Sequence, residues 1–89
     1  MRSKRTRQLR TLFAAFAMSA QREANEAYRR FRDDPTHPSV RFKPVRTRGP
    51  VYAARIGLHY RALALRRPDY WLWFWIGTHA EYDKRLTHI

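Results

Sequence analysis

A group of titratable side chains directly follows the most apolar stretch of the chain. Residues 70–76 (YWLWFWI) are all aromatic, Leu or Ile, and His79, Tyr82 and Asp83 come soon after Gly77. A neutral imidazole can accept a proton and a phenol can donate one, so His79 and Tyr82 could perform general acid–base chemistry. A helix that begins at His79 would place all three titratable residues on one face, because they lie three and four residues apart.

The same segment also has a purely structural interpretation. Thr78 and Glu81 have the T-x-x-E spacing of a capping box, which accounts for Glu81 without a catalytic role. An exposed histidine is common at the start of a helix, Tyr82 could pack against the sheet edge, and Asp83 could pair with a neighbouring Lys or Arg. His79 and Tyr82 therefore stay candidate catalysts only if other residues bring a substrate to them.

Two arginines could hold such a substrate by its phosphate. Arg55 and Arg61 flank residues 57–59, the connection between two predicted strands. A three-residue loop places the two arginines opposite each other, whereas a two-residue loop would place them on opposite faces. Directly opposed like charges destabilise a sheet unless an anion bridges them. A solvated face paired with acids is the alternative, but residues 40–68 contain no acid, so we favour phosphate contact.

The overall charge also favours a polyanionic partner. The 89-residue chain has a formal net charge of +12, and 17 of its 19 basic residues lie before residue 69. Sixteen of the 19 are arginine, whose planar guanidinium suits bidentate phosphate contacts. We expect RNA contacts from the basic residues that precede the second predicted strand, which are Arg41, Lys43, Arg46 and Arg48.

Several classes of site and location are disfavoured. The chain has no cysteine, which rules out disulfides and zinc–thiolate sites, and we expect neither a metal nor another cofactor. The N-terminus is basic and lacks the apolar core of a signal peptide. The apolar run at 70–76 is far too short to span a bilayer. We therefore predict a cytoplasmic protein with no membrane partner.

The predicted fold is α+β, with a single domain over residues 1–89. Residues 1–8 are expected to form a flexible basic arm, because they are nearly all polar. Apolar residues at helical spacing predict two helices, over 5–17 and from an N-cap at Ser19 to about residue 33, which form an antiparallel hairpin. Four strands follow, at 40–45, 51–56, 60–65 and 70–76, and short turns between them imply an antiparallel sheet.

Other details of the sheet also follow from the pattern. Pro44 suggests that the strand at 40–45 lies at an edge. The last strand should end at Gly77, with Trp71, Trp73 and Trp75 on one face in the core, before a short C-terminal helix. The predicted architecture is thus a helical hairpin packed on one face of a mostly antiparallel four-stranded sheet, with the other face available.

The order of these elements and several short motifs resemble the RelE/ParE superfamily of bacterial toxins from type II toxin–antitoxin systems. The motifs are Asp34-Pro35-x-His37-Pro38-Ser39, Val51-Tyr52-Ala53-Ala54-Arg55-Ile56, Tyr60-Arg61-Ala62-Leu63 and Trp73-Phe74-Trp75-Ile76-Gly77-Thr78-His79-x-x-Tyr82-Asp83. The likeness extends from about Leu9 to Leu86. It implies two helices on a mostly antiparallel sheet, whose open face binds RNA, and an acidic antitoxin that wraps the toxin. Relatives commonly begin with a strand that pairs with the last one, for which residues 1–8 are a poor match.

The resemblance also implies roles for single residues. Arg61 matches the arginine that active relatives carry on the third strand, and Arg55 matches the second of two basic residues on the preceding strand. The first of those two falls at Ala53, so one cation is missing. His79 lies where relatives have an arginine or another polar group, and Tyr82 lies close to a tyrosine that some relatives use.

These observations lead to a functional prediction with two alternatives. The prediction is a ribosome-dependent mRNA endoribonuclease that cleaves by 2′-hydroxyl attack without a metal. Its catalytic residues would be Arg61, His79, Arg55 and Tyr82, and its partners would be mRNA, the ribosome and an acidic, DNA-binding antitoxin. The alternatives are a non-catalytic inhibitor of DNA gyrase, as in the ParE branch, and a basic RNA-binding domain without toxicity.

Overall fold

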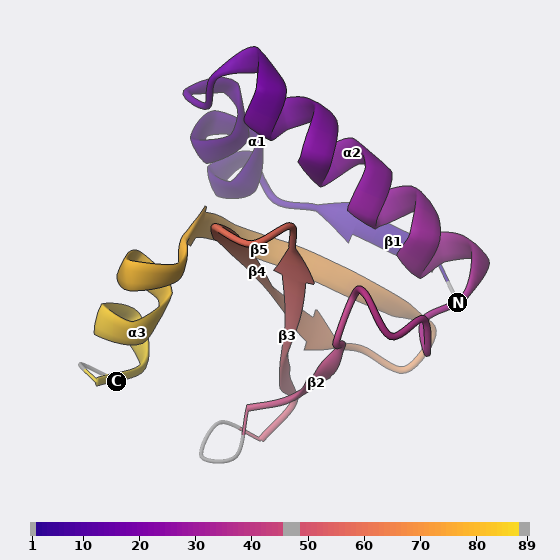
Figure 1. The fold of residues 1–89 in the computed structure, drawn as a ribbon. Coiled ribbons are helices and arrows are strands. Elements are labelled where there is room, and N and C mark those ends of the chain that lie inside the picture. The colour runs from indigo at the N-terminus through magenta and orange to yellow at the C-terminus, as the bar shows by residue number, and fades with distance from the viewer. Residues whose placement is uncertain (1, 46–48, 88–89) are drawn as a thin grey trace.

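The fold is a five-stranded mixed sheet with two helices on one face and a third helix at the end of the chain (Figure 1). A computed structural model describes residues 2–45 and 49–87. Within that part, the elements in chain order are β1 (Arg2–Arg5), α1 (Arg7–Ala14), α2 (Met18–Asp33), β2 (Lys43–Pro44), β3 (Val51–Ile56), β4 (Tyr60–Arg66), β5 (Tyr70–Thr78) and α3 (His79–Thr87). No helix among these residues is long and apolar enough to cross a membrane.

The sheet has one strand more than the sequence predicted, and it is not wholly antiparallel. Its order is β1-β5-β4-β3-β2, and β1 runs parallel to β5 while the other neighbours are antiparallel. Residues 2–5 form a strand and residues 7–8 begin α1, where a flexible basic arm was expected. Backbone pairing with β5 fixes this segment, and Lys4 adds a contact, with its ammonium 4.5 Å from the centre of the Tyr70 ring.

The two helices that follow β1 turn most of their predicted apolar faces to the sheet, but α1 is shorter than predicted and Ala17 is exposed. Both helices pack mainly on the sheet and not on each other, so they differ from the predicted antiparallel hairpin. α1 begins at Arg7 because residues 2–5 are in a strand, and the Thr6 hydroxyl caps it by accepting from the Leu9 amide at 3.1 Å. α2 begins at Met18, so its N-cap is Ala17 and not Ser19. The buried residues of α2 are Ala20, Ala24, Ala27 and Phe31.

The strand predicted at 40–45 is reduced to Lys43–Pro44. Arg41 has a φ of +45°, a left-handed conformation that interrupts an extended chain. Val40 is buried just before this bend, and its carbonyl accepts a hydrogen bond from the Arg55 amide. Pro44 does lie in an edge strand, as predicted, because β2 ends the sheet.

The prediction that three tryptophans share one face was wrong. β5 continues through Gly77 to Thr78, and its pairing with β4 shifts between Leu63 and Ala64. Leu63 pairs with Trp75, whereas Ala64 pairs with Trp73, which leaves Phe74 as an extra residue in β5. Side chains alternate along a strand, so this bulge turns Trp75 to the face opposite Trp73.

The two faces of the sheet therefore have different cores. On the face covered by α1 and α2, which we call the helix face, Phe31 packs edge-on against Trp73, with ring centres 5.2 Å apart. On the other face, which we call the open face, Trp75 forms a small cluster with Ala53 and Leu63, and Tyr82 of α3 packs against it. α3 thus covers only part of the open face (Figure 1).

Candidate nucleic-acid interface and catalytic site

The hairpin of β3 and β4 places Arg55 and Arg61 directly opposite each other on the open face. Their Cα positions are paired in the register, as a three-residue turn predicts. Gly57 allows the turn, since its φ of +59° is one that other residues rarely adopt. Arg55 Nε donates to the Gly57 carbonyl at 3.0 Å, and Arg61 Nη1 donates to the Tyr60 carbonyl at 2.8 Å. One nitrogen of each guanidinium is thus anchored, and other N–H donors can bind a ligand.

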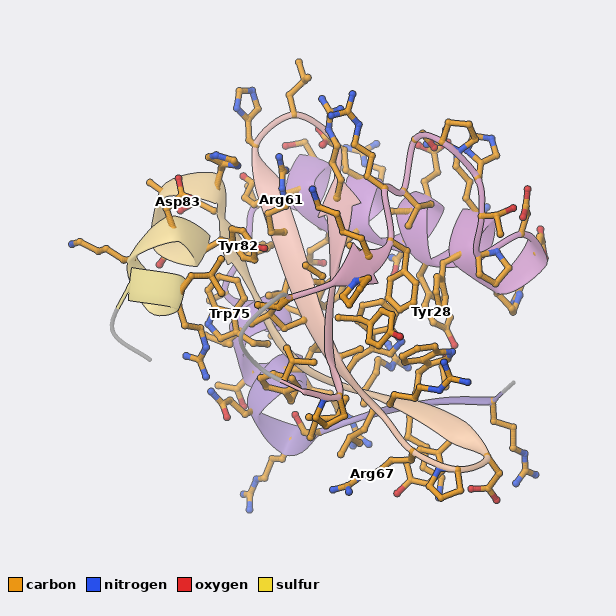
Figure 2. The ribbon with its side chains drawn as sticks, turned by 90° about the horizontal axis from the view of Figure 1, so that it is seen from below. Tyr28, Arg61, Arg67, Trp75, Tyr82 and Asp83 are labelled. Carbon is orange, nitrogen blue, oxygen red and sulfur yellow. The ribbon has the colours of Figure 1, made fainter. Side chains whose placement is uncertain are left out.

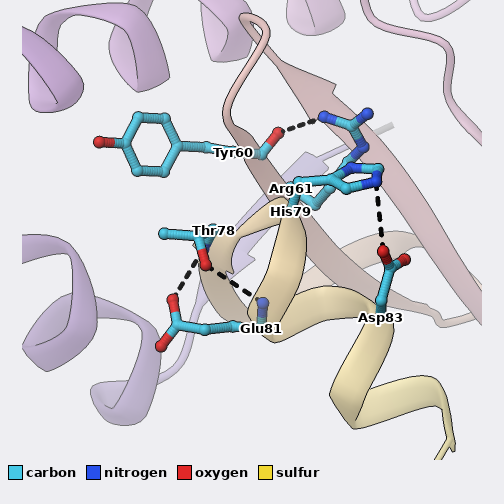
Figure 3. Close-up of polar contacts among 6 residues, drawn as sticks. All are labelled: Tyr60, Arg61, Thr78, His79, Glu81 and Asp83. Atoms are coloured by element: carbon cyan, nitrogen blue, oxygen red, sulfur yellow. Dashed lines mark hydrogen bonds and ion pairs between the residues drawn. The ribbon is translucent and has the colours of Figure 1, made fainter.

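α3 begins next to this hairpin. The predicted capping box is present, since the Thr78 amide donates to Glu81 Oε1 at 2.8 Å and the Glu81 amide donates to Thr78 Oγ1 at 3.1 Å (Figure 3). The His79 amide donates to the His59 carbonyl of the β3–β4 turn at 2.8 Å. These bonds fix the first turn of α3 beside the pair of arginines.

His79 and Asp83 face each other along α3. His79 Nε2 lies 3.3 Å from Asp83 Oδ2, with the two residues four positions apart (Figure 3). The rings of His79 and Tyr82 have centres 6.4 Å apart. Asp83 therefore pairs with the histidine, whereas the sequence had suggested a Lys or Arg neighbour.

Electrostatic effects link these residues into one site. Burial, and then the neighbouring charge of Arg55, lower the pKa of the Arg61 guanidinium, while Tyr82 and Asp83 act in the opposite direction. Burial raises the pKa of the Tyr82 phenol, against the effect of Arg61. Figure 2 shows Arg61, Tyr82 and Asp83 close together on the open face. Two guanidinium groups thus lie next to a phenol whose burial favours its protonated form.

The residues predicted to contact RNA fall into three groups. Arg41 is near enough to Arg61 to lower its pKa further. Lys43 lies opposite Ala53 in the pairing of β2 with β3, so its side chain extends from the open face. Arg46 and Arg48 lie outside the described residues.

Two residues of this surface were missed by the sequence-based prediction. The Arg85 guanidinium lies over the Trp75 ring, 5.5 Å from its centre, and both residues belong to the open face near Tyr82. Arg85 follows Tyr82 by three residues on α3, and this helical spacing was a usable signal. Trp75 could not be found in this way, because the bulge at Phe74 decides its face.

The side chains at this site can bind anions and transfer protons. Within residues 2–45 and 49–87, no group of three or more His, Cys, Asp and Glu side chains could hold a metal ion. Paired arginines can bind and neutralise a phosphate, while an imidazole and a phenol can exchange protons with groups attached to it.

Three solved structures of bacterial proteins share this fold. YafQ from Escherichia coli superposes with a TM-score of 0.69 over 92% of this chain and 98% of its own, at 10% identity. A copper-bound toxin mutant from Helicobacter pylori gives 0.62 over 91% and 97%, at 16% identity. The H. pylori protein HP0894 gives 0.64 over 90% and 96%, at 15% identity. At these low sequence identities, the structural similarity shows a shared fold and nothing more.

The sequence itself identifies the family. Among curated protein sequences, none matches this chain. The sequence model of the ParE-like toxin domain, however, matches residues 19–84, which is most of the chain and includes β2–β5 and most of α2 and α3. The chain therefore belongs to the ParE-like toxin domain family and is a toxin of the RelE/ParE superfamily.

Proposed function

We propose that this toxin is a ribosome-dependent endoribonuclease, which cleaves mRNA by attack of a ribose 2′-hydroxyl without a metal ion. The observation that carries the proposal is the direct opposition of Arg55 and Arg61 beside the first turn of α3. Two like charges held this close favour a bound anion between them. We take this anion to be the scissile phosphate, which would contact the two arginines and lie next to His79 and Tyr82 of α3.

Lys43 supplies the cation that Ala53 lacks. Ala53 is 4% exposed and packs with Leu63 and Trp75, so a long basic side chain at this position would not fit without repacking. Lys43 is its partner across the edge of the sheet and is exposed. A phosphate held by Arg55 and Arg61 would thus have a third positive charge on the adjacent strand, with Arg41 also close to Arg61.

His79 and Tyr82 exchange the protons of the reaction. The Asp83 carboxylate accepts from Nε2–H of His79, which leaves Nδ1 with the lone pair that takes the proton of the 2′-hydroxyl. The 2′-oxygen then bonds to phosphorus, and a 2′,3′-cyclic phosphate forms as the bond to the 5′-oxygen breaks. Tyr82, kept protonated by its burial, donates its proton to that leaving oxygen. Arg55 and Arg61 stabilise the negative charge on the phosphate in the transition state.

The partners follow from this activity and from the family. Membership of the toxin family implies a cognate antitoxin, which we expect to bind DNA. We also expect it to be acidic, since the toxin has a net charge of +12. The ribosome would present the mRNA to the open face. Both partners are negatively charged, so we expect them to compete for the same cations.

The direct test is to map 5′ ends of a reporter transcript after induction of the toxin in cells and in a purified translation system. The proposal expects new ends only when ribosomes are present, and far fewer with Arg61→Ala. Arg67→Ala is the matched control, because Arg67 is exposed in the β4–β5 turn and lies far from the site (Figure 2). Intact transcripts in a growth-arrested culture would refute the proposal.

The matching family description favours a second candidate, inhibition of DNA gyrase. The model that matches is that of ParE-like toxins, the branch for which the resemblance implies this activity. Loss of supercoiling by purified gyrase, together with DNA-damage signalling and intact mRNA, would establish it. Harmless induction would instead indicate a basic RNA-binding domain.

A further inference from the structure

A cavity lies on the helix face, away from the proposed catalytic site. Its volume is about 120 Å³, and apolar side chains of α1, α2 and the sheet make up most of its wall. The cavity exists because α2 presents Ala24 and Ala27 toward Ala54 of β3, where larger side chains would fill the space. An engineered apolar cavity of about 150 Å³ stays dry and binds benzene, so this space suits one small ring.

The rim of the cavity is polar and basic. Arg5, Arg10 and Asn25 line it, and all three residues are exposed, so the cavity reaches the surface between β1, α1 and α2. The Arg10 guanidinium donates to the Arg5 carbonyl at 3.3 Å, which holds it beside the opening. A second, more open cleft, lined by Arg2, Lys4 and Arg32, shares Tyr28 with the cavity and adds positive charge at its edge.

We infer that this cavity binds a small aromatic carboxylate, with the ring among the apolar side chains and the carboxylate at Arg5 and Arg10. The apolar wall favours the ring because it leaves water with few partners. A carboxylate at the rim keeps part of its hydration and gains charge-assisted hydrogen bonds. The site is independent of the proposed endoribonuclease function, since β3, β4 and β5 separate it from Arg61.

Methyl groups in the wall of the cavity can report binding by NMR, so the ligand needs no label. The methyl groups of Leu9, Val40, Ile56 and Ile76 line the cavity, while those of Leu63 and Leu65 belong to the other face of the sheet. Titration of the full-length chain with benzoate, followed by methyl NMR, should shift only the first set. Benzyl alcohol, a neutral analogue, should bind about tenfold more weakly.

Two pairs of variants locate the site. Arg10→Gln should weaken benzoate binding severalfold and leave benzyl alcohol unchanged, whereas Arg7→Gln, one turn away on α1 and outside the cavity, should change neither. Ala24→Met should fill the cavity and abolish binding of both probes, whereas Ala14→Met, at an exposed site, should not.

Each outcome decides the inference. Saturable shifts confined to the cavity methyl groups, with weaker binding of the alcohol and of Arg10→Gln, support it. No shift in the wild-type chain at millimolar benzoate overturns it, and this result does not depend on whether a variant folds. Equal affinity for benzoate and benzyl alcohol overturns the role of the arginines, and binding that survives in folded Ala24→Met overturns the location.

Discussion

The two faces of the sheet are formed by the same strands but differ in the side chains that they carry. On the helix face, Ala54, Ala62 and Ala64 alternate with outward residues and form a floor for aromatic side chains, so that this face supplies most of the buried core. On the open face, the same strands present Arg55 and Arg61, whose charges repel each other. The helix face thus supplies most of the stability, while the open face carries the proposed catalytic residues. Single substitutions should therefore affect one property and leave the other nearly intact.

The largest effect on stability is expected from Phe31→Ala on the helix face. Phe31 is 3% exposed and packs against Phe42 and Trp73, with ring centres 4.6 Å and 5.2 Å away. Its loss should lower the free energy of unfolding by about 3–5 kcal/mol, measured by urea denaturation. Leu58→Ala, at a residue 70% exposed, is the control and should change almost nothing. A loss below about 1 kcal/mol would contradict the assignment of stability to this face.

On the open face, Arg61→Ala should lower the rate of mRNA cleavage by about 10²–10³-fold, because it removes a donor from the developing charge on phosphate. Its free energy of unfolding should stay equal or rise, because the repulsion from Arg55 disappears. The rate of mRNA cleavage in a purified translation system and the free energy of unfolding from urea denaturation together test whether Arg61 affects activity alone. A variant that loses stability and activity in proportion would show that the arginine is structural.

A smaller effect is expected for Asp83→Asn, about a tenfold loss of cleavage, because His79 loses the carboxylate that orients it. Glu81→Gln is the matched control on the same helix, since it keeps an oxygen for the cap. The decisive measurement is a double-mutant cycle with His79→Ala. If Asp83→Asn still lowers the rate by tenfold when His79 is absent, Asp83 does not act through the histidine.

The smallest effect concerns pH and the capping box of α3. Hydrogen bonds from Thr78 lower the pKa of Glu81 from its ordinary value of 4.5, so the carboxylate stabilises the folded state. This contribution is complete above pH 4.5 and is lost as the pH falls through the lower folded pKa. The difference in unfolding free energy between the wild type and Glu81→Gln should therefore be constant near neutrality and shrink in acid. A difference that does not change with pH would contradict the role of the ionised cap.

The sequence predicted best those parts whose structure is decided locally. Turn length fixed the register that opposes Arg55 and Arg61, and helical spacing placed His79 beside Asp83. Strand β1 was missed because Arg2, Ser3, Lys4 and Arg5 have no apolar alternation, and only β5, some 68 residues later, gives them partners. The apolar run at 70–76 likewise carries no signal for the bulge at Phe74.

The site could be predicted only in part for the same reason. The pairing of Lys43 with Ala53 depends on how an edge strand of two residues aligns across a loop, and no local pattern encodes it. The left-handed conformation of Arg41 was equally hidden, because arginine has no preference for it. The sequence thus identified candidate catalytic side chains, but not all of the residues that lie next to them.

The parallel pairing of β1 with β5 also determines when a newly made chain can finish folding. Arg2 and its partner Tyr70 are 68 positions apart in the sequence. Such a contact between distant segments forms late, after the loop between them has closed. β1 therefore has no strand to pair with until β5 has been made. The sheet that carries Arg55 and Arg61 is complete only after this late pairing.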